Sequence, residues 1–460
     1  MKRTEVNDIL KATGGSLISQ GTSNFITDIK QDSRECKAGD MFVAVIGERL
    51  NGHAFVPQVI EAGCDTVLVS ERDWMESTDC SGVNVILVDD TVRALGDLAS
   101  WYLDTLGIRK IAVTGSVGKT STRDMSYYVL SEKFNCGRNL KNFNNEIGLP
   151  LSIFQFDETT EVAVLEMGMD HFGEISRLGE IVHPDIAVIT NIGVAHLENL
   201  GSQEGIFKAK MEVTEHLAGR ASGGTLIYPA DGVFLTKERT AGDYDQVEIG
   251  TDGRSDYIVT EIDDFGLEGI EFTLECDREC RRIKLPVPGV HNAINASVAI
   301  AAGRLLGVSV DEACNGLSKV SLTGSRLKKV RGRSVTIIDD TYNANPDSMK
   351  GALKVLEKSK ASGKKIAVLG DMFELGSDEK KQHYGVGVFA RGCGIDRLVA
   401  IGDLAREIAD GARGLDCSYY ETKEEFFRDV KDIVKPGDVI LVKASRGMAM
   451  EEVVEKLKEI

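Results

Sequence analysis

The segment IAVTGSVGKTST at residues 111–122 constrains the fold more than any other stretch of the chain. Three apolar residues run into a Gly-x-x-Gly-Lys-Thr turn, after which apolar side chains recur at helical spacing. Such a turn lets backbone N–H groups approach a phosphate, with Lys119 reaching the terminal phosphates and the Thr120 hydroxyl placed to ligate Mg²⁺. The full Walker pattern would put its first glycine at Val113, so this loop is a shortened variant. The segment predicts a nucleotide-binding domain, and the alternative is an ordinary strand-to-helix turn with a solvated lysine.

Composition narrows the classes of protein that fit this segment. The chain has 460 residues, room for about three domains. A net charge of −18 argues against nucleic-acid binding and against docking on anionic membranes. The nine cysteines are scattered without a CxxC pair, which favours reduced thiols over a zinc site. The N-terminus is polar and no apolar run has the length of a membrane span, so we expect a cytoplasmic protein without membrane insertion.

Polar residues follow the apolar runs on either side of the glycine turn. Residues 162–165 end at Glu166, and residues 186–189 continue to Asn191 and His196. Continuous apolar runs that alternate with helical patterns indicate a parallel sheet covered on both faces, where ligands bind beyond the carboxyl ends of the strands. Lys119 and these residues therefore predict one site. For Glu166 the alternatives are a ligand of Mg²⁺ and an exposed carboxylate at a strand end. For His196 they are a contact with a metal or phosphate and a purely structural role.

Several further polar segments admit two interpretations each. Ser33 and Arg34 could contact a phosphorylated ligand, or Asp-Ser-Arg could be a turn with a surface ion pair. Asn144 and Asn145 belong to a loop suited to polar substrate or to an asparagine-rich turn. Lys210 lies on a predicted helix and by default is a solvated surface lysine.

The asparagines at the start of the predicted helix after residue 290 also admit two interpretations. His291, Asn292 and Asn295 could hydrogen-bond a base edge, whereas Asn292 could instead cap the helix. Arg326, after a Thr-Gly junction, is placed to reach across to the nucleotide.

The spacing of the elements predicts an α/β protein of three domains. These are a small α/β N-terminal domain (1–90), a central P-loop-type parallel-sheet domain (91–324) and a C-terminal Rossmann-like domain (325–460). Residues 91–106 form a predicted junction helix, and residues 225–290 are expected to be rich in strands. In the last domain, apolar runs at 335–338, 366–369, 398–401 and 439–442 predict strands. No G-x-G-x-x-G follows the first of them, so a dinucleotide site is not expected there.

An ordered set of motifs resembles the Mur ligases, which build the cytoplasmic peptidoglycan precursor. The set is TGSVGKTS, NFNNEIGLP, EMGM, TNIGVAHL, Ala209-Lys210, GVHNAINA, DDTYNANPDSM, GDMFELG and KASRGM. The resemblance covers essentially the whole chain, and this family uses the shortened phosphate loop. DSR…GDMFVAVIGERLNGH and DDTYNANPDSM look like the members that add D-Ala-D-Ala to UDP-MurNAc-tripeptide. Pro229 and the Leu-Lys-Lys after Arg326 depart from the family pattern and leave local contacts open.

The resemblance implies ATP-dependent amide formation through an acyl phosphate. The first domain would hold the UDP end of the substrate, the second ATP and two Mg²⁺ ions, and the third would close over both. Lys119, Glu166, His196 and Lys210 match catalytic positions, with Thr120, Glu166, His196 and Lys210 serving the metal ions. Lys210 matches a lysine that is carbamylated by CO₂, which reverses its default interpretation. A monomer is expected, and the third residue of the tripeptide, Lys or diaminopimelate, is left open.

Further residues match the family's binding positions. The positions that the resemblance implies for nucleotide binding are Thr114, Gly115, Ser116, Val117, Gly118, Lys119, Thr120, Ser121, His291, Asn292, Asn295, Arg326 and Asp340. The positions that it implies for binding the UDP-sugar and peptide substrates are Ser33, Arg34, Asn144, Asn145, Tyr342, Asn343, Lys443, Ser445 and Arg446.

Three alternatives compete with this interpretation. One is the sister ligase that adds the third amino acid, whose diaminopimelate-using form usually carries Asp-Asn-Pro-Arg, a tetrapeptide absent from this sequence. Another is folylpolyglutamate synthase, which lacks the DSR-type first domain. The last is a nucleotide-binding regulatory protein without catalysis, against which the intact Lys119, Glu166, His196 and Lys210 argue.

Overall fold

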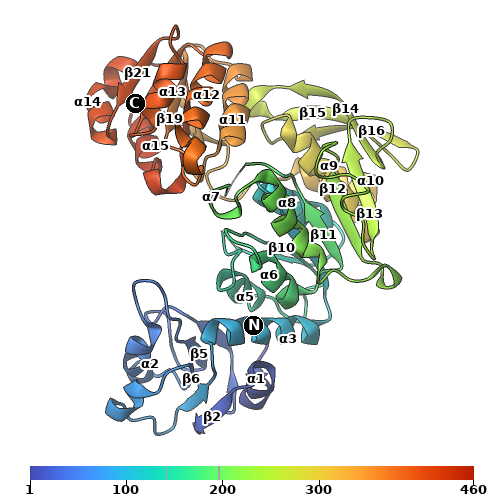
Figure 1. Cartoon of the computed structure of the whole chain (residues 1–460), viewed down its shortest axis with the longest axis vertical. Helices are drawn as coiled ribbons and strands as arrows, with labels where there is room; N and C mark the ends of the chain where they lie inside the picture. The colour runs from blue at the N-terminus through green and yellow to red at the C-terminus, as the bar shows by residue number, and fades with distance from the viewer. Residues whose placement is uncertain (141, 195–196) are drawn as a thin grey trace.

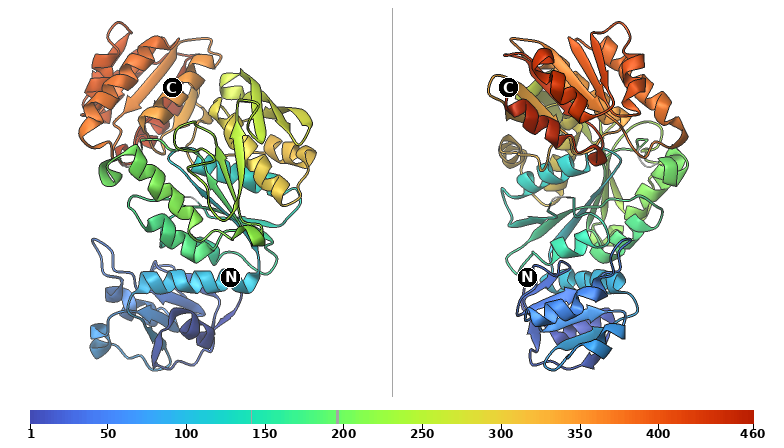
Figure 2. Two further views of the ribbon diagram at one scale, coloured as in Figure 1. Left: turned by 45° about the vertical axis from the view of Figure 1, so that its right-hand side comes forward. Right: turned by 90° about the vertical axis from the view of Figure 1, so that its left-hand side faces the viewer.

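The chain folds into three α/β domains arranged in a row, each built on its own sheet (Figure 1). The structure, a computed structural model, describes residues 1–140, 142–194 and 197–460. The N- and C-terminal domains lie at opposite ends of the molecule with the central domain between them (Figure 2). This confirms the predicted fold class.

The N-terminal domain is a small sheet with helices packed on it. Its strand order is β2-β7-β6-β5-β4, and a separate antiparallel pair joins β1 to β3. The bounds are β1 (Thr4–Glu5), α1 (Val6–Thr13), β2 (Ser16–Ser19), β3 (Phe25–Ile26), β4 (Asp28–Lys30), β5 (Asp40–Val43), α2 (Val56–Glu61), β6 (Thr66–Val69) and β7 (Asn84–Leu87).

Helix α3 (Thr91–Leu106) joins the N-terminal domain to the central one and has the bounds that its periodicity predicts. Asp90 caps it by accepting hydrogen bonds from the backbone N–H groups of Val92 and Arg93. Its buried face packs into the apolar cluster that runs from α1 to the helices of the central domain. The Tyr102 hydroxyl fixes the contact by donating to the Phe156 carbonyl at 2.7 Å.

The central domain is a nine-stranded sheet in the order β16-β15-β14-β13-β12-β11-β8-β10-β9. Strands β8 to β14 pair in parallel, and β15 and β16 add antiparallel strands at one edge. The strands are β8 (Arg109–Thr114), β9 (Cys136–Arg138), β10 (Val162–Glu166), β11 (Ile186–Ile189), β12 (Thr225–Pro229), β13 (Asp245–Gly250), β14 (Tyr257–Asp264), β15 (Ile270–Cys276) and β16 (Glu279–Leu285). The strand-rich region predicted at 225–290 is therefore confirmed.

Helices cover both faces of this central sheet, which explains its continuous apolar strands. On β8, Ile111 and Val113 pack into one core cluster while Ala112, between them, packs into the cluster on the opposite face. The helices are α4 (Lys119–Leu130), α5 (Gly148–Ile153), α6 (Glu174–Val182), α7 (Leu197–Leu200), α8 (Gln203–Met211), α9 (His291–Leu305) and α10 (Val310–Ser318).

The C-terminal domain is a six-stranded sheet in the order β17-β18-β22-β19-β20-β21, parallel except for β17. The predicted strands are confirmed within one or two residues. The bounds are β17 (Lys328–Arg331), β18 (Thr336–Asp340), α11 (Pro346–Lys358), β19 (Lys365–Gly370), α12 (Glu379–Gly392), β20 (Arg397–Ile401), α13 (Ala405–Gly411), β21 (Cys417–Tyr420), α14 (Lys423–Ile433), β22 (Val439–Lys443) and α15 (Glu451–Lys458).

Short 3₁₀ turns connect these elements at residues 52–55, 73–77, 212–214, 220–222, 266–268, 376–378 and 446–448. Across the described ranges, none of the helices is both long and apolar enough to cross a membrane.

Candidate active site

The segment that follows β11 contacts the glycine turn between β8 and α4 and holds it in place. Gly115 has φ 142° and Gly118 has φ 87°, backbone conformations that favour glycine. A Cβ on Gly115 would lie 2.0 Å from Thr190 Oγ1, so the close approach of the two segments requires a glycine there. The Thr190 hydroxyl donates to the Val117 carbonyl at 2.6 Å, and Asn191 Oδ1 accepts from the Val117 N–H at 2.8 Å. These contacts hold the loop in a fixed shape.

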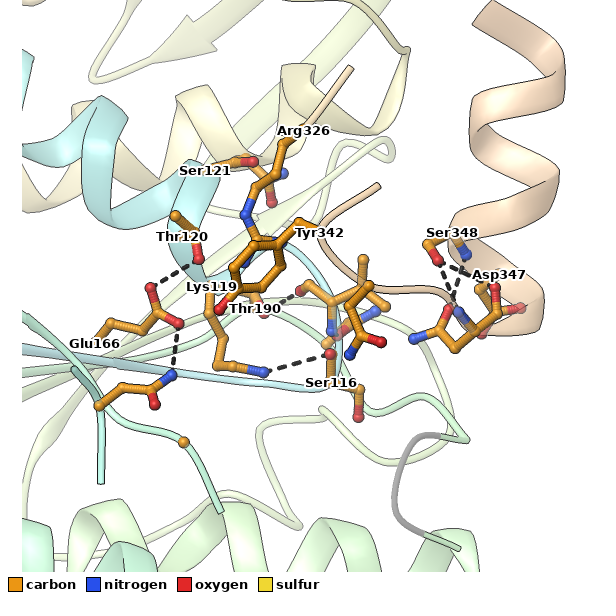
Figure 3. A pocket seen from close by; sticks show the side chains of 18 of the residues that line it. Ser116, Lys119, Thr120, Ser121, Glu166, Thr190, Arg326, Tyr342, Asp347 and Ser348 are labelled. Carbon is orange, nitrogen blue, oxygen red and sulfur yellow. Dashed lines mark hydrogen bonds between the residues drawn. The ribbon is translucent and has the colours of Figure 1, made fainter. Parts of the chain in front are cut away.

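Lys119, the first residue of α4, is folded back over the loop (Figure 3). Its Nζ donates to the Gly115 carbonyl at 2.7 Å and to the Ser116 carbonyl at 3.4 Å. Burial lowers the pKa of Lys119; Glu166 opposes this shift and Arg326 reinforces it. A cation held in this position is available to a polyphosphate on the loop.

Glu166 ends β10 beside the glycine turn and is almost fully buried. Its carboxylate accepts from Thr120 Oγ1 at 2.8 Å and from Asn144 Nδ2 at 2.9 Å (Figure 3). A hydroxyl and a carboxylate in contact are the hard oxygen ligands that Mg²⁺ takes when phosphate and water complete its shell. The described ranges contain no cluster of three His, Cys, Asp or Glu side chains able to hold a metal alone, and the predicted ligand His196 lies outside them.

The C-terminal domain supplies the opposite wall of the site. The Arg326 guanidinium lies over the Tyr342 ring, 4.0 Å from its centroid (Figure 3). Lys443 Nζ donates to Asp340 Oδ2 at 2.7 Å and to the Asn343 carbonyl at 2.7 Å. Burial raises the pKa of Asp340, although the neighbouring Lys443 opposes the shift.

The asparagines at the start of α9 line the same cavity as the glycine turn. Asn292 Nδ2 donates to the Pro288 carbonyl at 2.7 Å, and Asn295 Nδ2 donates to Asn292 Oδ1 at 2.9 Å. Among the described residues, no side chain makes a capping hydrogen bond to the start of α9, so the capping role considered for Asn292 is not observed. Asn295 Oδ1 lies 3.1 Å from where a Cβ on Gly118 would be, so it packs directly against the phosphate loop.

One cavity of about 1010 Å³ joins these walls from the central and C-terminal domains. The predicted residues that line it are Ser116, Val117, Gly118, Lys119, Thr120, Ser121, Asn144, Asn145, Glu166, His291, Asn292, Asn295, Arg326, Asp340, Tyr342, Asn343 and Lys443. Their individual roles stay predictions. Among the described residues, the cavity lining does not include Thr114, the last residue of β8, or Gly115, which follows it. It also does not include Ser33, Arg34, Lys210, Ser445 and Arg446.

Three of the predicted residues outside the cavity make local contacts. Arg34 pairs with Asp32 in an exposed turn, the alternative considered for Ser33 and Arg34. Ser445 Oγ accepts from the Phe373 N–H at 2.8 Å, and Arg446 pairs with Glu451 at 3.2 Å.

The environment of Lys210, in α8, differs most from what its local sequence predicts, which is a solvated surface lysine. Its side chain is fully buried, and among the described residues its Nζ has no hydrogen-bond partner. Burial, and next the nearby Lys119, hold the pKa of Lys210 well below its ordinary value. Burial favours the unprotonated form of a lysine, and this form can act as a nucleophile or accept a modification.

Sequence reasoning missed several side chains of this site. Thr190 directly follows a strand, so its place beside Asn191 could have indicated it. Asp347 and Ser348 line the cavity from the start of α11 and belong to the DDTYNANPDSM motif (Figure 3). Arg123 and Asp124, buried in α4, carry no signal in sequence because a charged pair on a helix is usually solvated.

Comparison with known proteins agrees with this geometry. Family models match residues 25–102 (Mur ligase family, catalytic domain), 113–303 (Mur ligase middle domain) and 325–446 (Mur ligase, glutamate ligase domain). The chain is 41% identical over 467 aligned residues to UDP-N-acetylmuramoyl-tripeptide–D-alanyl-D-alanine ligase of Bacillus subtilis, covering 100% of this chain and 99% of the relative. The chain belongs to the Mur ligase family. The Escherichia coli protein of the same name is 33% identical over 99% of this Mur ligase and 98% of the relative.

Solved structures show the same relationship. A crystal structure of MurF from Acinetobacter baumannii matches this Mur ligase with a TM-score of 0.92 at 30% identity, over 100% of this chain and 99% of that chain. MurF ligase from Thermotoga maritima in complex with ADP matches with a TM-score of 0.82 at 29% identity, over 94% and 97% of the two chains. Folylpolyglutamate synthase of Mycobacterium tuberculosis, at 17% identity and a TM-score of 0.59 over 78% of this chain, shares the fold.

Proposed function

We propose that this Mur ligase joins D-Ala-D-Ala to the terminal carboxylate of UDP-MurNAc-tripeptide at the expense of ATP. The observation that carries the proposal is 41% identity, over the full length of the chain, to a ligase of that name. The similarity includes the N-terminal domain, and the folylpolyglutamate synthase likeness covers only 78% of the chain. Use of ATP is further supported by the ADP complex of the Thermotoga maritima relative.

The chemistry has two steps. The peptide carboxylate attacks the γ-phosphorus of ATP, which forms an acyl phosphate and releases ADP. The amine of D-Ala-D-Ala then attacks the acyl carbon, the amide bond forms, inorganic phosphate leaves and the amine loses a proton. The first step brings two anions together, so it requires positive charge around the triphosphate. Lys119 and Arg326, on opposite walls of the cavity, would supply it.

Mg²⁺ would add further positive charge at the triphosphate. Thr120 and Glu166 fit one ion because their oxygens already touch at the edge of the phosphate loop. His196 is proposed for a second ion on the strength of the family resemblance. Asn144 would orient the Glu166 carboxylate through its 2.9 Å hydrogen bond.

Lys210 is proposed to be carbamylated, a reaction in which its neutral amine adds to CO₂ and releases one proton. The buried Nζ, without a partner among the described residues, and its lowered pKa support this, because the unprotonated amine is the form that reacts. Labelling with carbon-13 bicarbonate should produce a carbamate signal in the NMR spectrum of the wild type that Lys210→Ala lacks. Short carboxylic acids should partly restore activity to Lys210→Ala. A wild type without the signal would contradict the assignment.

The remaining contacts divide between the domains 1–90, 91–324 and 325–460. We assign the UDP-sugar to Ser33, Arg34, Asn144 and Asn145, and the peptide or its phosphate to Tyr342, Asn343, Lys443, Ser445 and Arg446. The adenine and ribose would contact His291, Asn292, Asn295 and Asp340. We expect a monomer that acts in the cytoplasm, where the precursor is made; light scattering after size-exclusion chromatography tests the first point.

Phosphate release from ATP tests the function. Purified protein should release phosphate only when UDP-MurNAc-tripeptide and D-Ala-D-Ala are both present, with one amide formed per phosphate. Turnover with UDP-MurNAc-dipeptide and diaminopimelate instead would identify the sister ligase. Turnover with a folate and glutamate would identify a folylpolyglutamate synthase. Nucleotide binding without turnover of any of these sets would indicate a regulatory protein.

A further inference from the structure

A buried charge network beneath the phosphate loop connects the predicted metal ligand Glu166 to the linker between the last two domains. We propose that Arg123 and Asp124 are positioning residues that hold this linker, and with it the C-terminal domain, in register with the ATP site. The inference rests on the proposed ligase function. Both side chains are fully buried in the first turns of α4, directly after the phosphate loop. Burying charges is costly unless each is paired, so such a pair calls for a specific arrangement.

Arg123 bridges two carboxylates. Its Nε and one terminal nitrogen donate to Asp124 Oδ1 at 2.9 and 2.7 Å, while the other terminal nitrogen donates to Glu166 Oε2 at 3.3 Å. Arg138 adds a third charge-assisted contact by donating to the same Asp124 Oδ1 at 2.7 Å. Asp124 Oδ1 therefore accepts hydrogen bonds from two arginines of the central domain, Arg123 and Arg138.

The second oxygen of Asp124 reaches the linker. Asp124 Oδ2 accepts from the backbone N–H of Thr323 at 2.6 Å, across 199 positions of sequence. On the far side of the linker, the Ser325 carbonyl accepts from the Tyr342 N–H at 3.2 Å, and Asp340 Oδ1 accepts from the Leu327 N–H at 3.1 Å. The linker is thus tied to the central domain at Thr323 and to the C-terminal domain from Ser325 onward.

Gly324 lies between these two attachments. It has φ 81°, and the nearest atom that a Cβ there would meet among the described residues is in the Tyr342 ring, at 3.7 Å. Rotation between the domains would therefore concentrate at this one residue, while Arg326 moves with the C-terminal domain. Loss of the Thr323 hydrogen bond would lengthen the part of the linker that is tied to neither domain. The residues of the C-terminal domain that line the cavity would then no longer be held in place over the acyl phosphate. Water would then compete with the amine for that intermediate.

Asp124→Asn tests the proposal with a near-isosteric change. The amide oxygen should stay with the two guanidinium groups, because they are charged, which leaves the NH₂ group facing the Thr323 N–H. We expect kcat to fall about tenfold or more, the effect of losing one hydrogen bond to a charged group. Affinity for ADP with Mg²⁺ should stay within about threefold, since the phosphate loop is unchanged. Phosphate released per amide formed should rise above one, a ratio that a simple loss of folded protein would not change.

Asp185→Asn is the matched control. Asp185 also accepts from a backbone N–H, that of Lys110 at 2.7 Å, and also pairs with an arginine, but at the opposite end of β8. It should keep the wild-type kcat and phosphate ratio. The positioning role is overturned if Asp124→Asn keeps both values, or if its nucleotide affinity falls as much as its kcat. A wild type that does not ligate would contradict the proposed function instead.

Two further measurements cover the case in which Asp124→Asn does not fold. Arg123→Lys keeps a cation between the carboxylates, but its single amine cannot reproduce the contacts that the guanidinium makes with both Asp124 and Glu166. The same fall in kcat and rise in the phosphate ratio are therefore expected. In the wild type, amide hydrogen exchange needs no substitution. The Thr323 amide should exchange at least about tenfold more slowly than an unprotected amide, and rapid exchange there would overturn the anchor.

Discussion

Substitution of Gly115 by alanine tests the close approach on which the nucleotide site depends. The new Cβ would lie 2.0 Å from Thr190 Oγ1 and about 3 Å from two backbone nitrogens, those of Thr190 and Asn191. Thr190 cannot simply rotate away, because its hydroxyl donates to the Val117 carbonyl at 2.6 Å. The phosphate loop and the end of β11 must therefore move apart.

Two energetic costs add at this position. A side chain at positive φ costs about 1–2 kcal/mol, and overpacking a buried site costs about 1–3 kcal/mol. The expected loss of unfolding free energy is therefore about 2–5 kcal/mol. Gly107, at the end of α3, has φ 62°, and a Cβ added there would meet no atom of the described residues within 4 Å. Gly107→Ala should therefore lose only the stability that a side chain at positive φ costs. The difference between the variants measures the close approach.

Urea unfolding followed by circular dichroism supplies the two free energies, and calorimetric titration with ADP and Mg²⁺ supplies the affinity. We expect Gly115→Ala to bind the nucleotide about tenfold or more weakly, because the Gly115 carbonyl also positions Lys119. Gly107→Ala should bind normally. Equal stability losses in the two variants, or unchanged affinity in Gly115→Ala, would refute the reasoning.

Three shorter predictions concern other sites. Burial lowers the pKa of His53 from its ordinary 6.5, and its Nε2 accepts from the Ser70 N–H at 2.9 Å, so the neutral ring is the stable form. Wild-type stability should fall relative to His53→Gln as the pH drops below about 6.5, measured by urea unfolding at several pH values. Lys443→Met should cost ~3–5 kcal/mol of stability in the same assay because it leaves the buried Asp340 unpaired, and Asp340→Asn should restore part of it. Lys119→Ala should weaken binding of ATP by a few kcal/mol in titration calorimetry, and wild-type affinity would refute its role.

Local patterns predicted most of the fold. Helix α3 follows from its apolar spacing, and the central strands follow from apolar runs that end at polar residues. Strand ends also predicted that Lys119 and Glu166 would share a site, because parallel strands direct their carboxyl ends to one edge. The Mur ligase motifs added the residues of the C-terminal wall.

Burial was the property that the sequence could not supply. Lys210 has the local pattern of a surface lysine, yet the packing of α8 removes it fully from solvent and leaves its amine without a described partner. Asn292 was expected to cap α9 as an alternative, but the fold directs its amide to the Pro288 carbonyl. The burial of Lys210 depends on how the chain packs in three dimensions, whereas the contact of Asn292 joins residues only four positions apart and depends on the local backbone geometry at the start of α9.

The chain alone therefore determined the glycine turn, the strands that lead to it and the family to which it belongs, since these depend on neighbouring residues and on ordered motifs. The tertiary structure alone decided how Asp124 meets Thr323 and how Gly115 meets Thr190. Such contacts join segments that are distant along the chain, and their strength comes from burial and close packing that no local pattern encodes.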